Sequence, residues 1–226
     1  MYSMFGRFCF TVIFAVLFSA YVVSGQTAIP TPAKGDPVKS NARPTPKPVV
    51  PVEPFDLADV KTMAAKCVKL ETEAGDIELE MFPESAPESV RNFLNLTAIG
   101  AFDTTTFSRV VPGFVIQGGN IWTRGSGVSQ ALGARARRPL QDEPNRILHE
   151  RGTLSMARTD DPNSATTHFF IFVDSAPSLD GKFAAFGRVT KGMEIVDAIN
   201  KMQVEGDKPV KSVLLKKATV FGCLAQ

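Results

Sequence analysis

The stretch from Cys67 to Cys223 is built of short apolar segments separated by turn residues, and this pattern restricts the possible folds more than any other feature of the chain. In segments 67–72 and 76–81, apolar and polar residues alternate on either side of a Glu-Ala-Gly turn, as in the two strands of a hairpin. Further segments with the character of strands are 106–111, 115–118, 153–157, 169–173, 183–189 and 212–221. Short strands joined by turns predict a mainly antiparallel β fold.

Two helices are predicted among these strands. The first has Pro87 in its first turn, ends near Gly100 and carries an apolar stripe of Val90, Phe93, Leu94 and Leu96. The second covers 193–200, and the Gly/Arg/Pro-rich segment 120–151 is predicted to be a long loop. Together the elements predict a closed eight-stranded antiparallel barrel capped by two helices. Side chains fill the interior of a barrel of this size, so we expect the binding site on its outer wall.

The first 25 residues have the pattern of a secretory signal peptide. Arg7 precedes an apolar run over residues 8–23, and the small residues Ser24 and Gly25 follow it. The run is shorter than the ~20 residues of a membrane-spanning helix, although an uncleaved anchor is the alternative. Either interpretation predicts an exported protein.

Residues 26–64 are predicted to form a linker. Because proline fixes φ and lacks an amide donor, a proline-rich segment forms neither helix nor central strand and favours an extended spacer. A tether is the preferred interpretation, and recognition of this segment by a partner is the alternative. We therefore expect the globular domain to occupy residues 65–224. The linker holds eight prolines: Pro30, Pro32, Pro37, Pro44, Pro46, Pro48, Pro51 and Pro54.

Composition excludes several classes of protein. The 226 residues contain 25 Lys and Arg against 23 Asp and Glu, and this balance argues against a dedicated nucleic-acid binder. The three cysteines form no CxxC pair, so no structural metal site is expected. The segments Gly118-Gly119 and Gly125-Ser126-Gly127 lack the Lys-Ser/Thr of a phosphate loop, so no nucleotide is expected. No other cofactor is expected either.

Segment 107–120, FSRVVPGFVIQGGN, is the most informative part of the chain. After the turn at Pro112 and Gly113, Phe114 and Gln117 can come round towards Arg109, so that a guanidinium, a phenyl ring and a carboxamide line one concave surface. The alternative is a surface arginine beside phenylalanines of the core. Periodicity alone favours that alternative.

This segment resembles the signature of the cyclophilins, a family of peptidyl-prolyl cis-trans isomerases. Four later blocks agree with the family in order and spacing, so the resemblance spans residues 67–223 and leaves out the signal peptide and the linker. The blocks look like those of bacterial members. They are GTLSMA at 152–157, HFFI at 168–171, LDGKF at 179–183 and FG at 186–187.

The resemblance implies a surface groove that accepts an X-Pro peptide. It places the catalytic arginine at Arg109 and the glutamine that bonds the substrate backbone at Gln117, with Phe114 completing the catalytic set. It also implies a group of substrate-binding residues around the proline: Val115, Ala157, Arg158, His168, Phe170, Leu179 and Phe183.

The reaction of this family needs no nucleophile, metal or proton relay, because X-Pro rotation breaks no covalent bond. A guanidinium beside the prolyl nitrogen would stabilise the twisted amide more than the planar one. The expected partners are unfolded or extended proline-containing polypeptides, bound by a monomer. A non-catalytic proline-peptide binding module or holdase on the same fold is the alternative, and a barrel with a small ligand inside is a third, disfavoured interpretation.

The chain departs from the family pattern at several positions. Ser178 stands where a tryptophan often helps to bind cyclosporin, which predicts weak cyclosporin binding with isomerase activity retained. Val115 replaces a frequent methionine and Phe183 a frequent histidine. His168 replaces a frequent glutamine, and Arg158 replaces an asparagine.

Three expectations concern residues outside this groove. His149 lies in the predicted loop and is expected to face solvent, as are Arg135, Arg137 and Arg138 in a solvated basic patch that is alternatively a site for acidic clients. Because the first and last strands of a barrel are neighbours and export favours oxidation, we hypothesise a Cys67–Cys223 disulfide. The periplasm is the favoured compartment, with secretion or membrane tethering as alternatives.

Overall fold

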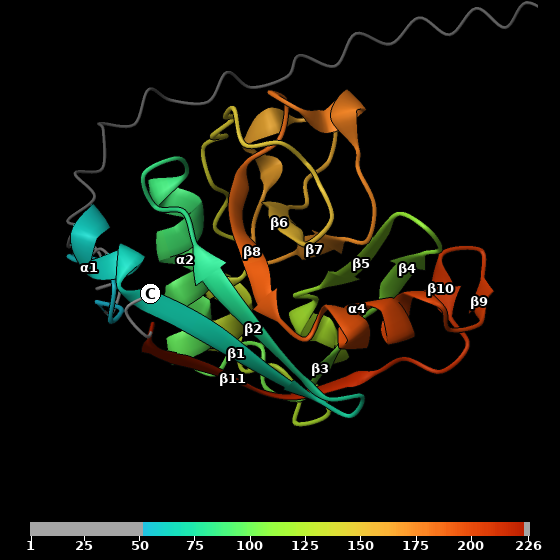
Figure 1. Cartoon of the computed structure of the whole chain (residues 1–226). Coiled ribbons are helices and arrows are strands. Elements are labelled where there is room, and N and C mark those ends of the chain that lie inside the picture. Colours follow the sequence, from blue (N-terminus) through green and yellow to red (C-terminus); the bar gives the residue numbers. More distant parts are fainter. Residues whose placement is uncertain (1–51, 224–226) are drawn as a thin grey trace, which may run out of the picture. The chain divides into compact units, whose positions relative to one another are not determined.

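The computed structural model describes residues 52–223 (Figure 1). The predicted signal peptide and the predicted linker up to residue 51 lie outside the described residues. No helix within 52–223 is long and apolar enough to cross a membrane.

Nine strands form one antiparallel sheet in the order β3-β11-β1-β2-β8-β6-β7-β5-β4, and a separate hairpin pairs β9 with β10 (Figure 1). Strands 76–81 and 115–118 have the predicted bounds, and most of the others shift by one or two residues. The strands are β1 (Lys66–Thr72), β2 (Asp76–Met81), β3 (Thr105–Thr106), β4 (Arg109–Val111), β5 (Val115–Gly118), β6 (Thr153–Met156), β7 (Phe169–Phe172), β8 (Ala185–Lys191), β9 (Val204–Glu205), β10 (Lys208–Pro209) and β11 (Leu214–Gly222).

The sheet differs from the predicted closed barrel of eight strands in strand number and in closure. Its two edge strands, β3 and β4, are not paired with each other. These two strands were predicted as a single strand over 106–111, but Phe107 and Ser108 separate them. The Phe107 amide donates to Val213 O on one side (3.1 Å), and the Ser108 amide donates to Gln117 O on the other (3.1 Å). Two residues therefore connect the opposite edges of the sheet.

The two predicted helices are present as α2 (Pro87–Ala98) and α4 (Met193–Asn200). Two short helices were not predicted, α1 (Val60–Ala64) and α3 (Gln130–Arg135), together with the 3-10 turns η1 (Ile121–Thr123), η2 (Pro162–Ser164) and η3 (Pro177–Leu179). The prediction of a loop over 120–151 was therefore wrong at η1 and α3. Helix α3 forms because the Ser129 side chain caps the Leu132 amide at its N-terminus.

Side chains fill the space on the core side of the sheet. This packing is consistent with the expectation of a binding site on the outer wall. Helix α2 packs against β8 and β11, and α4 packs against β2, β4 and β5. The largest fully buried rings are Phe93, Phe102, Phe107, Phe169, Phe172 and Phe186. This solid core gives no support to a ligand cavity inside the barrel.

The last part of the predicted linker belongs to the domain. Met63 of α1 is fully buried in the core, and the Phe55 amide donates to Asn95 Oδ1 (2.7 Å). The Arg91 guanidinium also donates to Phe55 O (2.7 Å). Because these bonds satisfy backbone groups, segment 53–64 packs on α2, and the domain starts before residue 65.

This docking also corrects the predicted basic patch. Arg135 is buried rather than solvated: it pairs with Glu53 and donates to Asn92 Oδ1 (2.9 Å). A guanidinium is buried only when paired, and the prediction missed this because its partner lies in the segment assigned to the linker.

The hypothesised disulfide is confirmed. Cys67 in β1 and Cys223 just after β11 are bonded, with Cα atoms 5.1 Å apart and a sequence separation of 156 residues. Strands β1 and β11 are hydrogen-bonded neighbours, as predicted, so the bond joins the first and last strands of the sheet.

Candidate active site

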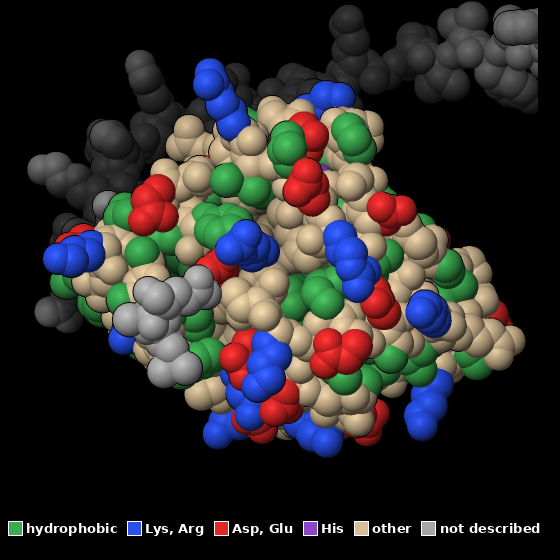
Figure 2. All heavy atoms as spheres, viewed as in Figure 1, with side chains coloured by type: hydrophobic (Ala, Val, Ile, Leu, Met, Phe, Trp, Pro, Cys, Tyr) green, Lys and Arg blue, Asp and Glu red, His purple; other side chains and the backbone are tan. Residues whose placement is uncertain are grey.

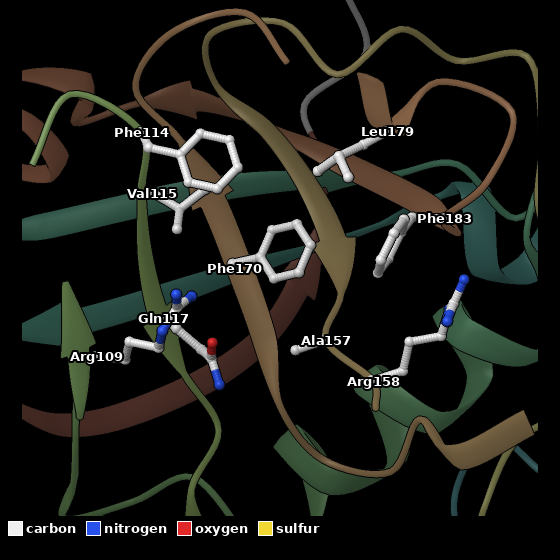
Figure 3. Close-up of a pocket in the computed structure, with 9 residues that line it drawn as sticks. All are labelled: Arg109, Phe114, Val115, Gln117, Ala157, Arg158, Phe170, Leu179 and Phe183. Atoms are coloured by element: carbon white, nitrogen blue, oxygen red, sulfur yellow. The ribbon is translucent and has the colours of Figure 1, made fainter. Parts of the chain in front are cut away.

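A tight turn between β4 and β5 builds one side of the site. The Phe114 amide donates to Val111 O (3.0 Å), and Gly113 adopts φ +71°, a conformation that glycine reaches without strain. Asn200, at the end of α4, holds this turn from behind: its side chain accepts from the Gly113 amide (2.8 Å) and donates to Val111 O and Val115 O. The turn therefore presents Phe114 and Val115 at a fixed position (Figure 3).

Arg109 and Gln117 face each other across β4 and β5. They are register partners, so their side chains leave the sheet on the same face (Figure 3). The Arg109 side chain is 41% exposed, and its Nε and Nη2 donate to Asp207 Oδ2 (3.0 and 2.8 Å) from the turn between β9 and β10. The guanidinium is thus oriented by a carboxylate while remaining open to solvent.

Aromatic rings form the apolar wall beside this pair. The Phe170 ring meets the Phe172 ring edge-on (5.1 Å between centroids), and Phe172 meets Phe114 in the same way (5.6 Å). The result is a cavity of about 230 Å³ with apolar side chains on one side and the arginine and glutamine on the other (Figure 3). It is lined by Arg109, Phe114, Val115, Gln117, Ala157, Arg158, Phe170, Leu179 and Phe183.

A second cavity of about 300 Å³ adjoins the first and is more polar. The two share Gln117, Ala157 and Arg158, and His168 lines only the second. His168 Nδ1 lies 3.2 Å from Gln117 Nε2. Burial lowers the pKa of His168, which favours the neutral ring that accepts this hydrogen bond. The second cavity also contains Thr159, Ser164 and Thr166.

Arg158 joins the two cavities on the side opposite Arg109. Its guanidinium carbon lies 4.2 Å from the centre of the Phe183 ring, and its Nη2 donates to Lys182 O (3.1 Å). The cation therefore holds the Phe183 ring as part of the wall.

One glycine is required where β5 ends. Gly119 adopts φ +82°, and a Cβ atom there would lie 2.2 Å from Thr167 O. This close approach brings the start of β7, with His168, beside Gln117. The glycine pair at 118–119 thus serves packing.

All ten predicted site residues are therefore brought together, nine in the first cavity and His168 in the second. Their positions agree with the resemblance, whereas their catalytic and binding roles stay predictions. Sequence reasoning missed Asp207 and Asn200, because neither lies in a motif and both are far from Arg109 along the chain.

The prediction that His149 faces solvent was wrong. It is 1% exposed, and its ring contacts Asp180, Ser155 and Phe172. The loop assignment led to the expectation of solvent exposure, but the ring turns inward behind the first cavity.

The surface charge is mixed. Figure 2 shows Lys and Arg side chains interspersed with Asp and Glu on this face of the molecule. Ion pairs in the described domain include Lys69 with Asp76 (2.8 Å) and Lys191 with Glu78 (3.3 Å). Within residues 52–223, no three His, Cys, Asp or Glu side chains are grouped so that they could hold a metal ion.

Comparison with known families agrees with this geometry. Residues 67–220 match the model of the family described as cyclophilin type peptidyl-prolyl cis-trans isomerase/CLD. The chain belongs to this family. The match covers the sheet and both cavities and ends within β11.

Several relatives of the cyclophilin domain are named peptidyl-prolyl cis-trans isomerases. The chain is 38% identical over 159 residues to cypE of Dictyostelium discoideum, covering 70% of this chain and 99% of that protein. It is 39% identical over 160 residues to peptidyl-prolyl cis-trans isomerase A of Dickeya dadantii, covering 68% and 80%. The cyclophilin domain described here is accordingly a peptidyl-prolyl isomerase.

Solved structures give the same fold. The domain is similar to a cyclophilin type isomerase of Cryptosporidium parvum, crystallised in the presence of the dipeptide Ala-Pro, with 30% sequence identity and a TM-score of 0.61. The match covers 70% of this chain and 99% of that one.

Proposed function

We propose that this cyclophilin accelerates the rotation of X-Pro bonds in unfolded or extended exported polypeptides, with Arg109 stabilising the twisted amide. The observation that carries the proposal is the position of Arg109, whose exposed guanidinium lines the same cavity as the apolar wall of Phe114 and Phe170. A proline ring fits against the wall while its nitrogen lies towards the cation.

The physical basis is the difference between the planar and the twisted amide. Resonance gives a rotation barrier of about 18–20 kcal/mol, and the twisted state loses this conjugation and gains a lone pair on nitrogen. Asp207 occupies Nε and Nη2 of Arg109 and leaves Nη1 for the substrate. A donor aimed at the lone pair stabilises the twisted state selectively, which is what catalysis requires.

One charged hydrogen bond is too weak to explain the whole rate. It contributes about 1.5–3 kcal/mol, whereas acceleration from minutes to milliseconds needs about 7 kcal/mol. The remainder is assigned to the apolar wall, which clamps the proline, and to Gln117, which holds the neighbouring backbone.

The test is a protease-coupled isomerase assay on a short X-Pro peptide, with peptide binding measured in parallel. Arg109→Ala is expected to lower kcat/KM by about 10- to 150-fold, as follows from losing 1.5–3 kcal/mol, while peptide affinity falls less. Arg109→Lys keeps the charge but not the planar donors and is expected to be intermediate. Loss of binding with unchanged turnover per bound peptide would contradict the catalytic role of Arg109, and peptide binding without any isomerase activity in the unmodified protein would favour the proline-peptide binding module or holdase.

We further propose that the protein is an exported, bacterial type of cyclophilin of the periplasm. The apolar run at 8–23 supports export, and the Cys67–Cys223 disulfide suits an oxidising compartment. Fractionation followed by N-terminal sequencing tests this: a mature chain starting near Gln26 is expected, and retention of residues 1–25 would favour the anchor.

Weak cyclosporin binding by a monomer is part of the same proposal. Ser178 lies exposed on η3 beside Leu179, where it offers no ring to a ligand. Nanomolar inhibition in a cyclosporin titration would contradict it, and a dimer in light scattering would contradict the monomer.

A further inference from the structure

His149 lies behind the first cavity and lines neither cavity, yet it contacts the elements that carry its walls. It sits between β6, β7 and the loop that contains η3. Its side chain is fully buried, so it meets no substrate directly. Three sets of contacts define what it does.

The first set fixes the loop that carries Leu179. The His149 amide donates to Asp180 Oδ1 (2.8 Å), and the ring Nδ1 lies 3.0 Å from the same oxygen. Four residues before Asp180, the Ala176 amide donates to His149 O (2.7 Å). His149 thus holds η3 from both ends, and Leu179 is the residue between these anchors that lines the cavity.

The second set supports the aromatic wall. The His149 ring meets the Phe172 ring edge-on, with centroids 5.2 Å apart. Phe172 in turn packs edge-on against both Phe114 (5.6 Å) and Phe170 (5.1 Å). Phe172 is fully buried, so a shift of the His149 ring must be transmitted to one of these two rings.

The third contact joins the ring to β6. His149 Nε2 lies 3.2 Å from Ser155 Oγ, whose hydroxyl donates to Ala184 O (3.0 Å). The ring is thus held to β6 at Nε2 and to the loop that carries Leu179 at Nδ1.

We propose that His149 is a positioning residue of the isomerase site, which fixes the separation between the wall at Leu179 and the wall at Phe114 and Phe170. The inference rests on the proposed function, because the spacing matters only if a proline ring is clamped between these walls. Its effect is expected in substrate binding more than in the rotation step, which depends on Arg109.

The decisive variant is His149→Phe. It keeps a ring against Phe172 and both backbone bonds of residue 149, and it removes only the side-chain bonds to Asp180 and Ser155. Ser155 retains its bond to Ala184, and Asp180, whose side chain is 28% exposed, can be hydrated. We expect a folded protein in which KM for an X-Pro peptide rises about tenfold and kcat changes less than about threefold.

A double-mutant cycle tests the route through the loop. If His149 acts by holding Leu179, then in a Leu179→Ala background His149→Phe should add less than about twofold to the loss of kcat/KM. The matched control is Thr97→Val in α2, which also removes one buried hydrogen bond, from Thr97 Oγ1 to Phe93 O (2.8 Å). This control should lower the melting temperature and leave KM unchanged.

Several results would overturn the inference. They are an unchanged KM in folded His149→Phe, fully additive losses with Leu179→Ala, or an equal rise of KM in Thr97→Val. Should His149→Phe fail to fold, Asp180→Ala tests the same link from the loop side and must raise KM in a folded protein. Failure of the proposed function is distinguishable, because Arg109→Ala would then keep the kcat/KM of the unmodified protein.

Discussion

At the scale of single residues, Arg109 depends on a partner that is 98 positions away along the chain. Asp207 binds Nε and Nη2 of the guanidinium, and its own carbonyl accepts from the Val110 amide (2.8 Å). The turn between β9 and β10 is therefore anchored to β4 by its backbone, and the carboxylate sets the plane of the guanidinium.

This arrangement predicts the effect of changing Asp207. Asp207→Ala should lower kcat about tenfold, because the guanidinium loses its orientation. Asp207→Asn loses the charge but keeps one oxygen, which can accept both bonds as Oδ2 does, and it should recover at least half of the loss on a logarithmic scale. Steady-state kinetics on an X-Pro peptide measure both, and equal kcat in all three proteins would contradict the orienting role.

A second residue-scale prediction concerns pH. Burial lowers the pKa of His168 from its ordinary value of 6.5, so the folded state favours the neutral ring. The folded state therefore loses stability as the pH falls from 6.5 towards the lower pKa that His168 has in the folded protein. Protonation also turns Nδ1 from acceptor to donor and breaks its bond with Gln117 Nε2. We expect kcat/KM to fall as the pH is lowered from 6.5, the ordinary pKa of histidine, through the lower pKa of the folded state.

The control for this prediction is His168→Gln, which can still bond Gln117 but does not titrate. Its kcat/KM should stay level over the same pH range in a pH-rate profile. An identical acid limb in this variant would assign the pH effect to another group.

The residues predicted for the site do lie together in the fold, whereas the residues that support them were not predicted. The turn at Pro112 and Gly113 allowed Arg109 and Gln117 to lie together, but it was the resemblance to the cyclophilin signature that placed them in one site, because periodicity alone favoured a surface arginine. Asp207 and His149 were missed or misplaced because their roles arise from contacts between distant segments, which no periodicity records.

At the scale of elements, α4 supports the turn between β4 and β5. Asn200 is 4% exposed and makes three hydrogen bonds to this turn, one as acceptor and two as donor. The helix therefore fixes the position of Phe114 and Val115 although it contributes no side chain to the cavity.

Asn200→Ala removes these three bonds. We expect the free energy of unfolding to fall by about 2 kcal/mol and kcat/KM to fall about fivefold as the turn loosens. The control from the same helix is Ile199→Val, which should cost about 1 kcal/mol of stability without a change in kcat/KM. Denaturant unfolding and the isomerase assay give both values, and equal kinetic losses in the two variants would refute a specific role of the turn.

Elements were predictable where their patterns are long or bounded by clear turns. Helix α4 and strands β2 and β5 have the predicted bounds, since apolar periodicity defines them. Helices α1 and α3 have five and six residues, too few for a period, and α1 lies beside a run of prolines. The break between β3 and β4 was missed because Phe107 and Ser108 continue the alternation of a strand while their amides bond to two different neighbours.

At the scale of the whole domain, the disulfide joins β1 to the end of β11 across 156 residues of sequence. Removing it with Cys67→Ser and Cys223→Ser together should lower the free energy of unfolding by about 2–4 kcal/mol. The melting temperature should then fall by about 5–15 °C. Neither cysteine lines the two cavities, so kcat/KM at 25 °C is expected to stay unchanged.

Calorimetry and the isomerase assay on the oxidised, reduced and double-serine proteins provide the measurement. A melting temperature that does not respond to reduction would show that the bond contributes nothing to stability. The disulfide was predictable because only two cysteines remain after residue 25 and both lie on terminal strands. The closure of the barrel was predicted wrongly, because it depends on whether the two edge strands pair with each other, which no sequence pattern records.

The short edge strand β4 bears on how an enzyme of this kind avoids trapping its own clients. Unfolded chains can pair with an exposed edge strand of a sheet, and repeated strand addition leads to aggregation. Here the edge strand beside the site, β4, is three residues long, and the amide of its middle residue, Val110, already donates to the Asp207 carbonyl. An extended polypeptide therefore finds little free backbone for strand addition at β4. Under the proposed function its binding depends on the first cavity instead, and it can dissociate after the X-Pro bond has rotated.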